Sequence, residues 1–435
     1  MTKKRNSMIK LMANILFAIV LFFSMSMPVF AAGDPVIAPD EDSPAEAAIT
    51  KKLEMPVNTI TPEVTFTFTI DKVDVDEDDS VEALATMPDL GATKTLSFNG
   101  EAGTESGGTK TVIQETADLF SGVEWPHAGI YTYHITENQT STLANSFEHQ
   151  IGYSKAEYDL VVYVVAKDPP NEDELYVYAV SAKRTKTDDN KDGNDEKVDP
   201  TPGGGDKYEY SQMIFTNTYL HNNGGTDPNN DDVLAISKTV DGQGGNQSKP
   251  FDFSVTVTEP AVGSPAGPYK AYIMEGTTNM TTSANGGTGY TENASAPGNY
   301  ISFASGSAVT EIKLTHGQKL VFVDLPVGTS FEVTETGTPD YTPKCKLTLN
   351  GADMGTTNAV MGNSLSVPAS TDTTLYIGEG DSDDNSAAFL NTYKGITPTG
   401  LGVDNLPFIV MIIIAAAALT GYVVYKTRRN ATRSM

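Results

Sequence analysis

Short runs in which apolar and polar residues alternate recur along most of the chain. Clear examples lie at 64–70, 130–135, 158–165, 175–180, 251–257 and 319–323. Alternation with a period of two places the apolar side chains on one face of a β-strand. Clusters of Gly, Asn, Asp and Pro separate the runs, as is typical of antiparallel sandwiches. The pattern predicts an all-β protein of immunoglobulin-like β-sandwiches, with no long helix outside an apolar segment near each end.

The apolar segment near the N-terminus has the composition of a signal peptide. Four basic residues among the first ten precede an apolar run at 11–23, and small residues lead to Ala31. A positive start, a short apolar core and a small-residue cleavage site direct export and are then removed. We expect residues 1–31 to be cleaved off and the rest to lie outside the cell. The alternative is an uncleaved anchor helix, for which the run is short.

The C-terminal region, 395–435, has three consecutive parts. Residues 396–400 end in Pro398-Thr399-Gly400, residues 407–425 are apolar, and the basic tail covers 426–435. The apolar part is long enough to cross a membrane once as a helix. Basic residues stay on the cytoplasmic side, so the bulk of the chain is expected outside.

Two polar segments divide the remainder of the chain. Residues 32–48 are rich in Pro, Ala and acids and are predicted to be a disordered linker. Residues 221–231 contain no apolar side chain and are predicted to be a second linker. The sequence therefore predicts two β-sandwich domains, at 49–220 and 232–394.

The two predicted domains share a weak internal repeat. Four patterns recur in the same order: 49–51 with 236–238, 66–70 with 251–255, 133–137 with 331–335, and 215–219 with 389–393. Similarity in a fixed order indicates repeated structural units. Each unit opens on a strand that carries a lysine and closes on a strand that carries an asparagine.

The polar residues shared by the repeats are one Lys, one Glu and one Asn per unit. They are Lys51, Glu137 and Asn217 in the first unit, and Lys238, Glu335 and Asn391 in the second. If these strands are neighbours, burial lowers the pKa of the lysine and raises that of the glutamic acid. A neutral amine is a nucleophile, and a protonated carboxyl can donate to the Asn carbonyl and shuttle protons. The expected product is an amide between the first and last strands, with loss of ammonia.

These patterns resemble known families of Gram-positive surface proteins. The first unit resembles the streptococcal pilin isopeptide-linkage domain, and the second resembles the B-type domain of adhesins and pilins. The C-terminal region resembles a sorting signal, with Thr397 where the usual pentapeptide has Pro. The resemblance implies cleavage by sortase between Thr399 and Gly400, and isopeptide bonds Lys51–Asn217 and Lys238–Asn391 with Glu137 and Glu335 as catalysts.

The resemblance leads to a functional hypothesis and leaves alternatives open. The chain is expected to be a structural, pilin-like subunit at the surface of a Gram-positive cell. Its expected partners are sortase, peptidoglycan or neighbouring pilin subunits, and the membrane before sorting. The main alternative is a monomeric wall-anchored adhesin or stalk that binds a host or surface ligand. Salt-bridged strand edges without a covalent bond are the alternative for the triads, and a plain single-pass anchor is the alternative for the C-terminus.

Composition narrows the functional classes further. The chain has 29 Lys and Arg against 56 Asp and Glu, a net charge of −27, which disfavours nucleic acid as a partner. Its one cysteine, Cys345, excludes an internal disulfide, and alternation with Leu347 and Leu349 predicts that it is buried. No catalytic constellation of a secreted hydrolase stands out, so the chain is expected not to be an enzyme beyond its self-directed cross-linking.

Two weaker patterns concern metal binding and polymerisation. Asp188, Asn190, Asp192 and Asp199 fit part of a calcium loop, with an acidic hairpin tip as the alternative and no other cofactor expected. Polymerisation by a sortase requires an exposed nucleophilic lysine. Lys197 and Lys207 precede the closing strand of the first unit, and Lys344 lies in a Tyr-Thr-Pro-Lys sequence; these three are the candidates.

Overall fold

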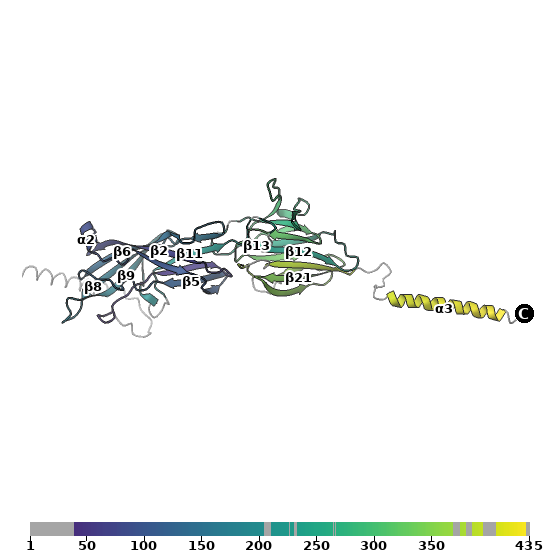
Figure 1. The fold of residues 1–435 in the computed structure, drawn as a ribbon, viewed down its shortest axis with the longest axis horizontal. Coiled ribbons are helices and arrows are strands. Elements are labelled where there is room, and N and C mark those ends of the chain that lie inside the picture. Colours follow the sequence, from purple (N-terminus) through teal and green to yellow (C-terminus); the bar gives the residue numbers. More distant parts are fainter. Residues whose placement is uncertain are drawn as a thin grey trace, which may run out of the picture.

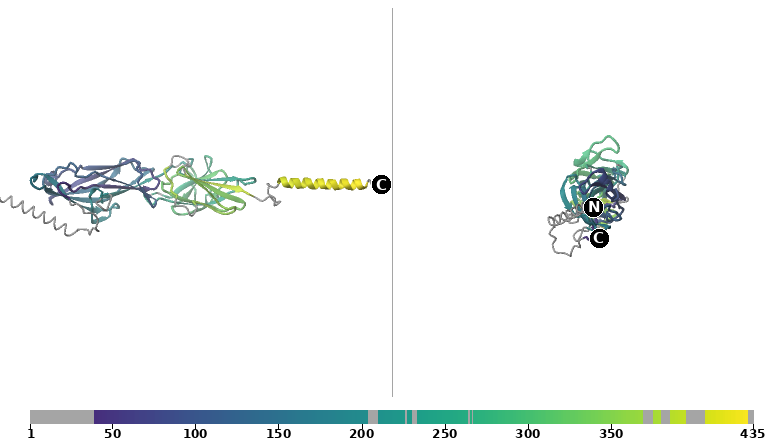
Figure 2. Two further views of the ribbon diagram at one scale, coloured as in Figure 1. Left: turned by 90° about the horizontal axis from the view of Figure 1, so that it is seen from below. Right: turned by 90° about the vertical axis from the view of Figure 1, so that its left-hand side faces the viewer.

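The computed structural model describes residues 39–203, 210–225, 227–229, 233–263, 265, 267–368, 375–379, 385–394 and 406–431. Figure 1 shows two β-rich units in line along the long axis, followed by a helix beyond the second unit. A view turned by 90° keeps the same order of parts, so the molecule is a rod (Figure 2).

The first unit is a sandwich of two sheets around one core. One sheet has the order β4-β5-β1-β11-β7, and the other has the order β10-β9-β8-β6-β2-β3. The strands of the first sheet are β1 (Thr50–Pro56), β4 (Thr104–Ser106), β5 (Thr109–Glu115), β7 (His149–Gly152) and β11 (Ile214–His221). Those of the second are β2 (Val64–Val75), β3 (Thr93–Phe98), β6 (Gly129–Ser141), β8 (Glu157–Ala166), β9 (Leu175–Lys186) and β10 (Asp192–Val198). A short helix, α2 (Val81–Thr86), follows β2.

The second unit is also a two-sheet sandwich. Its larger sheet has the order β16-β17-β14-β19-β12-β24-β21-β22, with β15 paired to β14, and its smaller sheet has the order β18-β13-β20-β23. The larger sheet contains β12 (Leu234–Asp241), β14 (Tyr269–Glu275), β15 (Thr278–Asn279), β16 (Tyr290–Thr291), β17 (Tyr300–Phe303), β19 (Gln318–Phe322), β21 (Tyr341–Leu349), β22 (Ala352–Asn358) and β24 (Ser386–Tyr393). The smaller sheet contains β13 (Phe251–Thr258), β18 (Val309–Leu314), β20 (Ser330–Glu335) and β23 (Leu365–Val367), and a 3₁₀ helix covers Gly287–Gly289.

The alternating pattern predicts these strands for a simple physical reason. Along β2, residues 64–70 alternate strictly between buried and half-buried positions, and β13 alternates between buried positions and half-buried or exposed ones. The buried side chains of each unit form one contiguous hydrophobic core between its two sheets. The prediction of an all-β, immunoglobulin-like sandwich architecture is therefore confirmed.

In both units the first and last strands are parallel neighbours. β1 pairs with β11 so that Lys51 lies opposite Phe215, and β12 pairs with β24 so that Lys238 lies opposite Phe389. Parallel pairing of strands so far apart in sequence needs a long connection, which here is the whole of the unit. A bond between these strands would therefore join the two ends of each unit.

The segments expected to be linkers contain residues that pack against the sandwiches. Ala45, Ala47 and Ala48 are buried, and the amide of Ala47 donates to Asp118. Residues 45–48 thus differ from the expected disordered linker, because three alanines without charge can fill space at the edge of a core. Asn222 is also buried and forms a bridge with Pro326 of the second unit.

Polar contacts cross the joint between the two units. His221, at the end of β11, places Nδ1 2.9 Å from Glu379 Oε1 and Nε2 3.5 Å from Glu148 Oε1. Burial alone lowers the pKa of His221, but the two carboxylates outweigh burial and raise it. Asn58 of the first unit donates to the carbonyl of Tyr376 in the second at 2.8 Å. These contacts connect the two sandwiches end to end.

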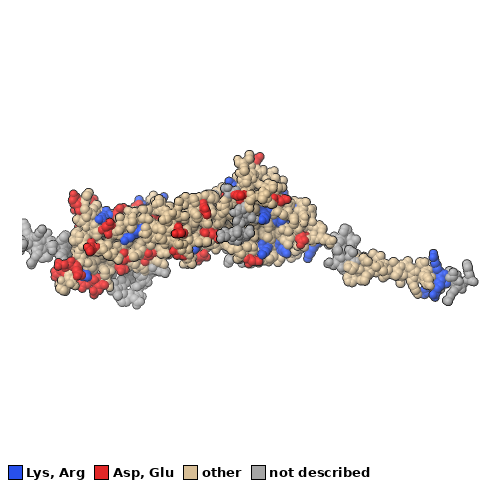
Figure 3. Space-filling view, viewed as in Figure 1, with Lys and Arg blue, Asp and Glu red and all other residues tan. Residues whose placement is uncertain are grey.

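The helix α3 (Leu406–Ala431) extends away from both sandwiches (Figure 1). Its segment Pro407–Arg429 has a mean hydropathy of 2.4 and is not buried against the rest of the chain. Length and composition thus suit a single membrane span, and its basic end stands out in Figure 3. The expected signal peptide, 1–31, and the Pro-Thr-Gly motif with Thr399 and Gly400 lie outside the described residues.

Candidate functional site

The first unit brings Lys51, Glu137 and Asn217 together in its core. Lys51 comes from β1 and Asn217 from β11 of one sheet, whereas Glu137 comes from β6 of the facing sheet. Lys51 Nζ lies 2.6 Å from Glu137 Oε2, and Asn217 Nδ2 donates to Glu137 Oε1 at 2.6 Å. All three residues are buried. Each carboxylate oxygen therefore contacts one of the two nitrogens.

Strand register explains why these side chains meet. Leu53 lies opposite Asn217 on the parallel partner strand, so Lys51 and Asn217 are displaced by two residues and point to the same face. On the facing sheet Glu137 pairs with Phe68. Lys52, the neighbour of Lys51, has the opposite parity and is half-buried, with an ion pair to Glu54 at 2.5 Å. Only Lys51 of the two lysines reaches the core.

The second unit repeats this arrangement with a different detail. Lys238 Nζ lies 2.9 Å from Glu335 Oε1, and Asn391 Nδ2 donates to the same oxygen at 2.5 Å. Val240 lies opposite Asn391, and Phe253 pairs with Glu335, so the register matches that of the first unit. The repeat seen in the sequence thus corresponds to two buried Lys–Glu–Asn triads in equivalent positions.

Aromatic rings surround both lysines. Lys51 Nζ lies 4.7 Å from the ring centroid of Phe66, and Lys238 Nζ lies 4.1 Å from that of Phe251. A ring face stabilises an ammonium, but less well than water does. The rings therefore surround each amine with apolar groups and only partly offset the loss of hydration of its charged form.

Burial shifts the pKa values of both pairs towards the neutral forms. Burial lowers the pKa of Lys51 to about 8, although the nearby Glu137 opposes the shift, and burial raises the pKa of Glu137. In the second unit burial lowers the pKa of Lys238 to about 8 and raises that of Glu335. A neutral amine beside a protonated carboxyl is the protonation state that a nucleophilic attack on an amide requires.

The orientation of the Asn217 carboxamide differs from the sequence-based expectation. The glutamic acid was expected to donate to the carbonyl oxygen of the asparagine. Instead, Asn217 Oδ1 accepts from the backbone N–H of Ser154 at 2.6 Å, and Nδ2 faces Glu137. The sequence pattern did not identify Ser154, because a backbone donor in an irregular segment leaves no side-chain signature.

Two family models match the chain, one for each unit. Residues 47–220 match the Spy0128-like isopeptide containing domain, and residues 232–393 match a domain of unknown function, DUF7601. The first unit is thus similar to the Spy0128-like isopeptide containing domain over nearly its whole length. Its triad occupies the core of that matched segment, with Lys51 near the beginning and Asn217 near the end.

Among curated proteins, a pilin of Streptococcus pyogenes serotype M1 is 23% identical over 392 residues, which cover 89% of this chain and 92% of that pilin. Among solved structures, the major pilin from Streptococcus pyogenes is 18% identical with a TM-score of 0.28, covering 80% of this chain and 99% of that one. Another major pilin of that species is 15% identical with a TM-score of 0.28, covering 80% and 98%.

The residues expected to bind calcium lie around the hairpin of β9 and β10 in the first unit. Asp188 Oδ1 accepts from Ser154 Oγ and from the amide of Thr216. Asn190 and Asp192 are exposed, and Asp199 lies beyond the end of β10. Across the described part of the chain, no three His, Cys, Asp or Glu residues group as a metal site. Calcium binding stays a prediction.

Two of the three candidate pilus lysines lie within the described residues. Lys197 is exposed on β10, and Lys344 is exposed on β21. Lys207 lies outside the described residues. That one of these three lysines joins subunits stays a prediction.

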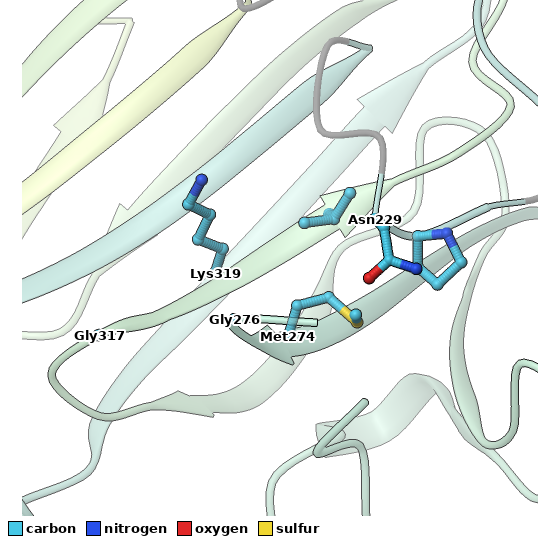
Figure 4. A pocket seen from close by; sticks show the side chains of 7 residues that line it. Asn229, Met274, Gly276, Gly317 and Lys319 are labelled. Atoms are coloured by element: carbon cyan, nitrogen blue, oxygen red, sulfur yellow. The ribbon is translucent and has the colours of Figure 1, made fainter. Parts of the chain in front are cut away.

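A shallow pocket of about 120 Å³ lies on the outer face of the second unit (Figure 4). Its lining residues are Pro228, Asn229, Met274, Gly276, Gly317, Lys319 and Val321. Met274 and Val321 belong to a small apolar cluster separate from the main core, so they occupy the face of the sheet opposite to the triad. The pocket is therefore distinct from the Lys–Glu–Asn site.

Cys345 lies beside the second triad and supports a prediction about its reactivity. Burial raises the pKa of its thiol to about 12, and the charge of Glu335 adds to this effect. Because the thiolate is the reactive form, alkylation of the folded chain at pH 8 should be at least about 100-fold slower than that of the chain in denaturant. Mass spectrometry of iodoacetamide-treated chain measures the rate. Labelling of the folded chain at the denatured rate would contradict a buried thiol.

Proposed function

We propose that the chain is a pilin-like structural subunit that forms an intramolecular isopeptide bond in each unit, Lys51–Asn217 and Lys238–Asn391. The observation that carries this proposal is the same buried Lys–Glu–Asn triad in both units. Ordinary surface ion pairs contribute little and lie in solvent. Here the charges are buried among aromatic rings, an arrangement that is costly unless the groups neutralise or react.

The proposed reaction follows from the positions of the two glutamic acid oxygens in the first unit. Proton transfer from Lys51 to Glu137 leaves a neutral amine and a neutral acid. Lys51 Nζ attacks Cγ of Asn217, forming the C–N bond and placing negative charge on Oδ1. Glu137 then gives its proton to Nδ2 and takes one from Nζ. The Cγ–Nδ2 bond breaks, ammonia leaves, and Glu137 ends protonated as it began the attack.

The proposed placement at the cell surface rests on both ends of the chain and on the family match. The pilin of Streptococcus pyogenes aligns over nearly its whole length. The exposed apolar helix α3 with its basic end suits a temporary membrane anchor, and Thr399-Gly400 precedes it as a sortase site. In this proposal Thr399 is transferred by sortase to peptidoglycan or to a lysine of a neighbouring subunit.

The cross-links can be tested by mass. The full chain, purified in detergent, is expected to weigh less than its own sequence by one ammonia for each bond, two in all. Tryptic peptides of the denatured chain should include two branched peptides, one with Lys51 joined to Asn217 and one with Lys238 joined to Asn391. Asn217→Ala and Asn391→Ala should each restore one ammonia. The full sequence mass in the unaltered chain would reject the proposal.

Polymerisation has a separate readout. Wall extracts of cells that make the chain and its sortase should show a ladder of high-mass species on denaturing gels. Of the three single variants Lys197→Arg, Lys207→Arg and Lys344→Arg, only one should lose the ladder. A single band of monomer size would favour the alternative of a wall-anchored adhesin or stalk.

A further inference from the structure

The carboxamide of Asn217 has a fixed orientation. Its Oδ1 accepts from the amide of Ser154 at 2.6 Å, and its Nδ2 donates to Glu137 at 2.6 Å. A backbone N–H can only donate. Rotating the carboxamide by half a turn would set two donors, Nδ2 and the Ser154 amide, against each other. The oxygen that gains negative charge during attack by Lys51 therefore already faces an N–H group.

The segment that carries this amide is held in place from several sides. β7 ends at Gly152, and the chain leaves the ladder before Ser154. The carbonyl of Ser154 accepts from Gln139 Nε2 at 2.7 Å. Ser154 Oγ accepts from the amide of Ala156 at 3.1 Å and donates to Asp188 Oδ1 at 2.5 Å. Every polar group of Ser154 thus has a partner, and each restricts the direction of its N–H.

Asp188 ties this segment to the strand that carries the reacting asparagine. Its Oδ1 also accepts from the amide of Thr216 at 2.9 Å, directly before Asn217 in β11. The close approach of β7 to β11 depends on Gly152, where a Cβ atom would lie 2.5 Å from Thr218 Oγ1. One carboxylate oxygen therefore sets the position of Ser154 relative to Asn217.

We propose that the backbone N–H of Ser154 is the oxyanion donor for formation of the Lys51–Asn217 bond, and that Asp188 is its positioning residue. This inference rests on the proposed function. A fixed donor aimed at a developing oxyanion needs no reorganisation during the reaction, and loss of one such donor costs about 100-fold to 1,000-fold in rate. The donor also leaves Glu137 facing Nδ2, where a proton is needed when ammonia departs.

The second unit has no counterpart to this donor among the described residues. Asn391 Oδ1 and Glu335 Oε2 are buried without a hydrogen-bond partner there. The physical reason is the neighbouring strand: β21 pairs with β24 past Asn391, from Tyr341 to Thr348, so its backbone stays in the ladder. The second triad therefore provides an internal control within the same molecule.

The test follows the rate of each bond in newly made protein. The full chain is synthesised in a cell-free system with detergent, quenched in acid at intervals, and digested. Mass spectrometry then quantifies the two branched peptides. Ser154→Pro removes the N–H and should slow the Lys51–Asn217 bond by about 100-fold or more, with the second bond unchanged. Ser154→Ala keeps the N–H and should slow the first bond by about tenfold at most.

Asp188 provides a matched pair of variants that separates position from charge. Asp188→Asn keeps an oxygen that can accept from Ser154 and Thr216, whereas Asp188→Ala removes it. The negative charge of Asp188 also raises the pKa of Lys51, so loss of charge alone would speed the attack. Positioning predicts a slower first bond in Asp188→Ala and no slowing in Asp188→Asn. Equal or faster formation in Asp188→Ala would overturn the inference.

A folding defect is distinguishable from loss of the donor. Hydrogen exchange of β1 and β11 in Glu137→Gln, with and without Ser154→Pro, shows whether proline alone disrupts the strands. Preserved protection with wild-type bond formation in Ser154→Pro would also overturn the inference. If proline unfolds the strands, the Asp188 pair decides. Absence of both branched peptides in the unaltered chain would instead reject the proposed function itself.

Discussion

Replacing Glu137 by Gln is expected to slow formation of the Lys51–Asn217 bond by about 100-fold or more. Gln has the same shape and can still contact Lys51 and Asn217, but it cannot carry a proton from Nζ to the departing Nδ2. Loss of a general acid–base typically costs this much in rate. Glu335→Gln should have the same effect on the Lys238–Asn391 bond and none on the first.

The measurement is the yield of each branched tryptic peptide in newly synthesised full chain. Each variant controls for the other, since a folding defect confined to one unit leaves the other bond unaffected. Glu54→Gln is a matched control, because Glu54 contacts the half-buried Lys52 on the outward side of β1. Normal yield of the first bond in Glu137→Gln would remove Glu137 from the reaction.

Removal of a bond is expected to lower stability in a way that depends on pH. The Lys51–Asn217 bond closes a loop of more than 160 residues, and loops of this size stabilise by about 5 kcal/mol in the chain-entropy description. Asn217→Ala should therefore unfold at a lower guanidinium chloride concentration than the unaltered chain. It also leaves Lys51 as a buried amine, whereas the cross-linked nitrogen is an amide that does not titrate.

The direction of the pH effect follows from the pKa of this amine. Burial lowers the pKa of Lys51 from 10.5 to about 8 in the folded chain. Between about pH 8 and pH 10.5 the unfolded chain therefore binds more protons at Lys51 than the folded chain. The stability of Asn217→Ala should rise relative to the unaltered chain as pH increases from 8 to 10, and the burial cost should be fully present below pH 8.

Lys51→Met separates the two contributions. It loses the bond and the loop constraint, but it places an apolar side chain of similar length among Phe66 and Phe68. Its unfolding midpoint should fall as in Asn217→Ala, without the rise between pH 8 and pH 10. Guanidinium unfolding of the three full chains in detergent, followed by tyrosine fluorescence, provides the comparison. Equal midpoints for Asn217→Ala and the unaltered chain would contradict a stabilising bond.

Sequence patterns predicted the hydrophobic cores of both units, because the inward side of a strand follows from local periodicity. Alternation at 64–70 and 251–257 placed Phe66 and Phe253 inward, and the structure buries both. The alignment of residues 49–51 with 236–238 selected Lys51 rather than its neighbour Lys52. The order of the repeat then identified Glu137 and Glu335, which lie on the facing sheets and contact the two lysines.

Other features depended on groups that meet only after folding. Ser154 is 63 residues from Asn217, and it contributes a backbone amide, which every non-proline residue possesses. Asp188 belongs to an acidic run whose pattern predicts a calcium loop or, alternatively, a hairpin tip. Only the fold places its carboxylate next to Ser154 and Thr216. Ala45 to Ala48 resembled a linker because small residues carry no strong pattern.

The sequence by itself determined the all-β class, the twofold repeat and the residue types of both triads, because these follow from parity along strands and from order along the chain. The tertiary structure alone decided which oxygen of each glutamate contacts the Lys and Asn nitrogens, and which group faces the Asn side-chain oxygen. That difference depends on whether the strand beside the asparagine continues in the ladder, as β21 does, or ends early, as β7 does. Hydrogen bonds between residues far apart in the sequence, such as those of Ser154 and Thr216 with Asp188, hold the segment that follows β7, and local periodicity does not encode them.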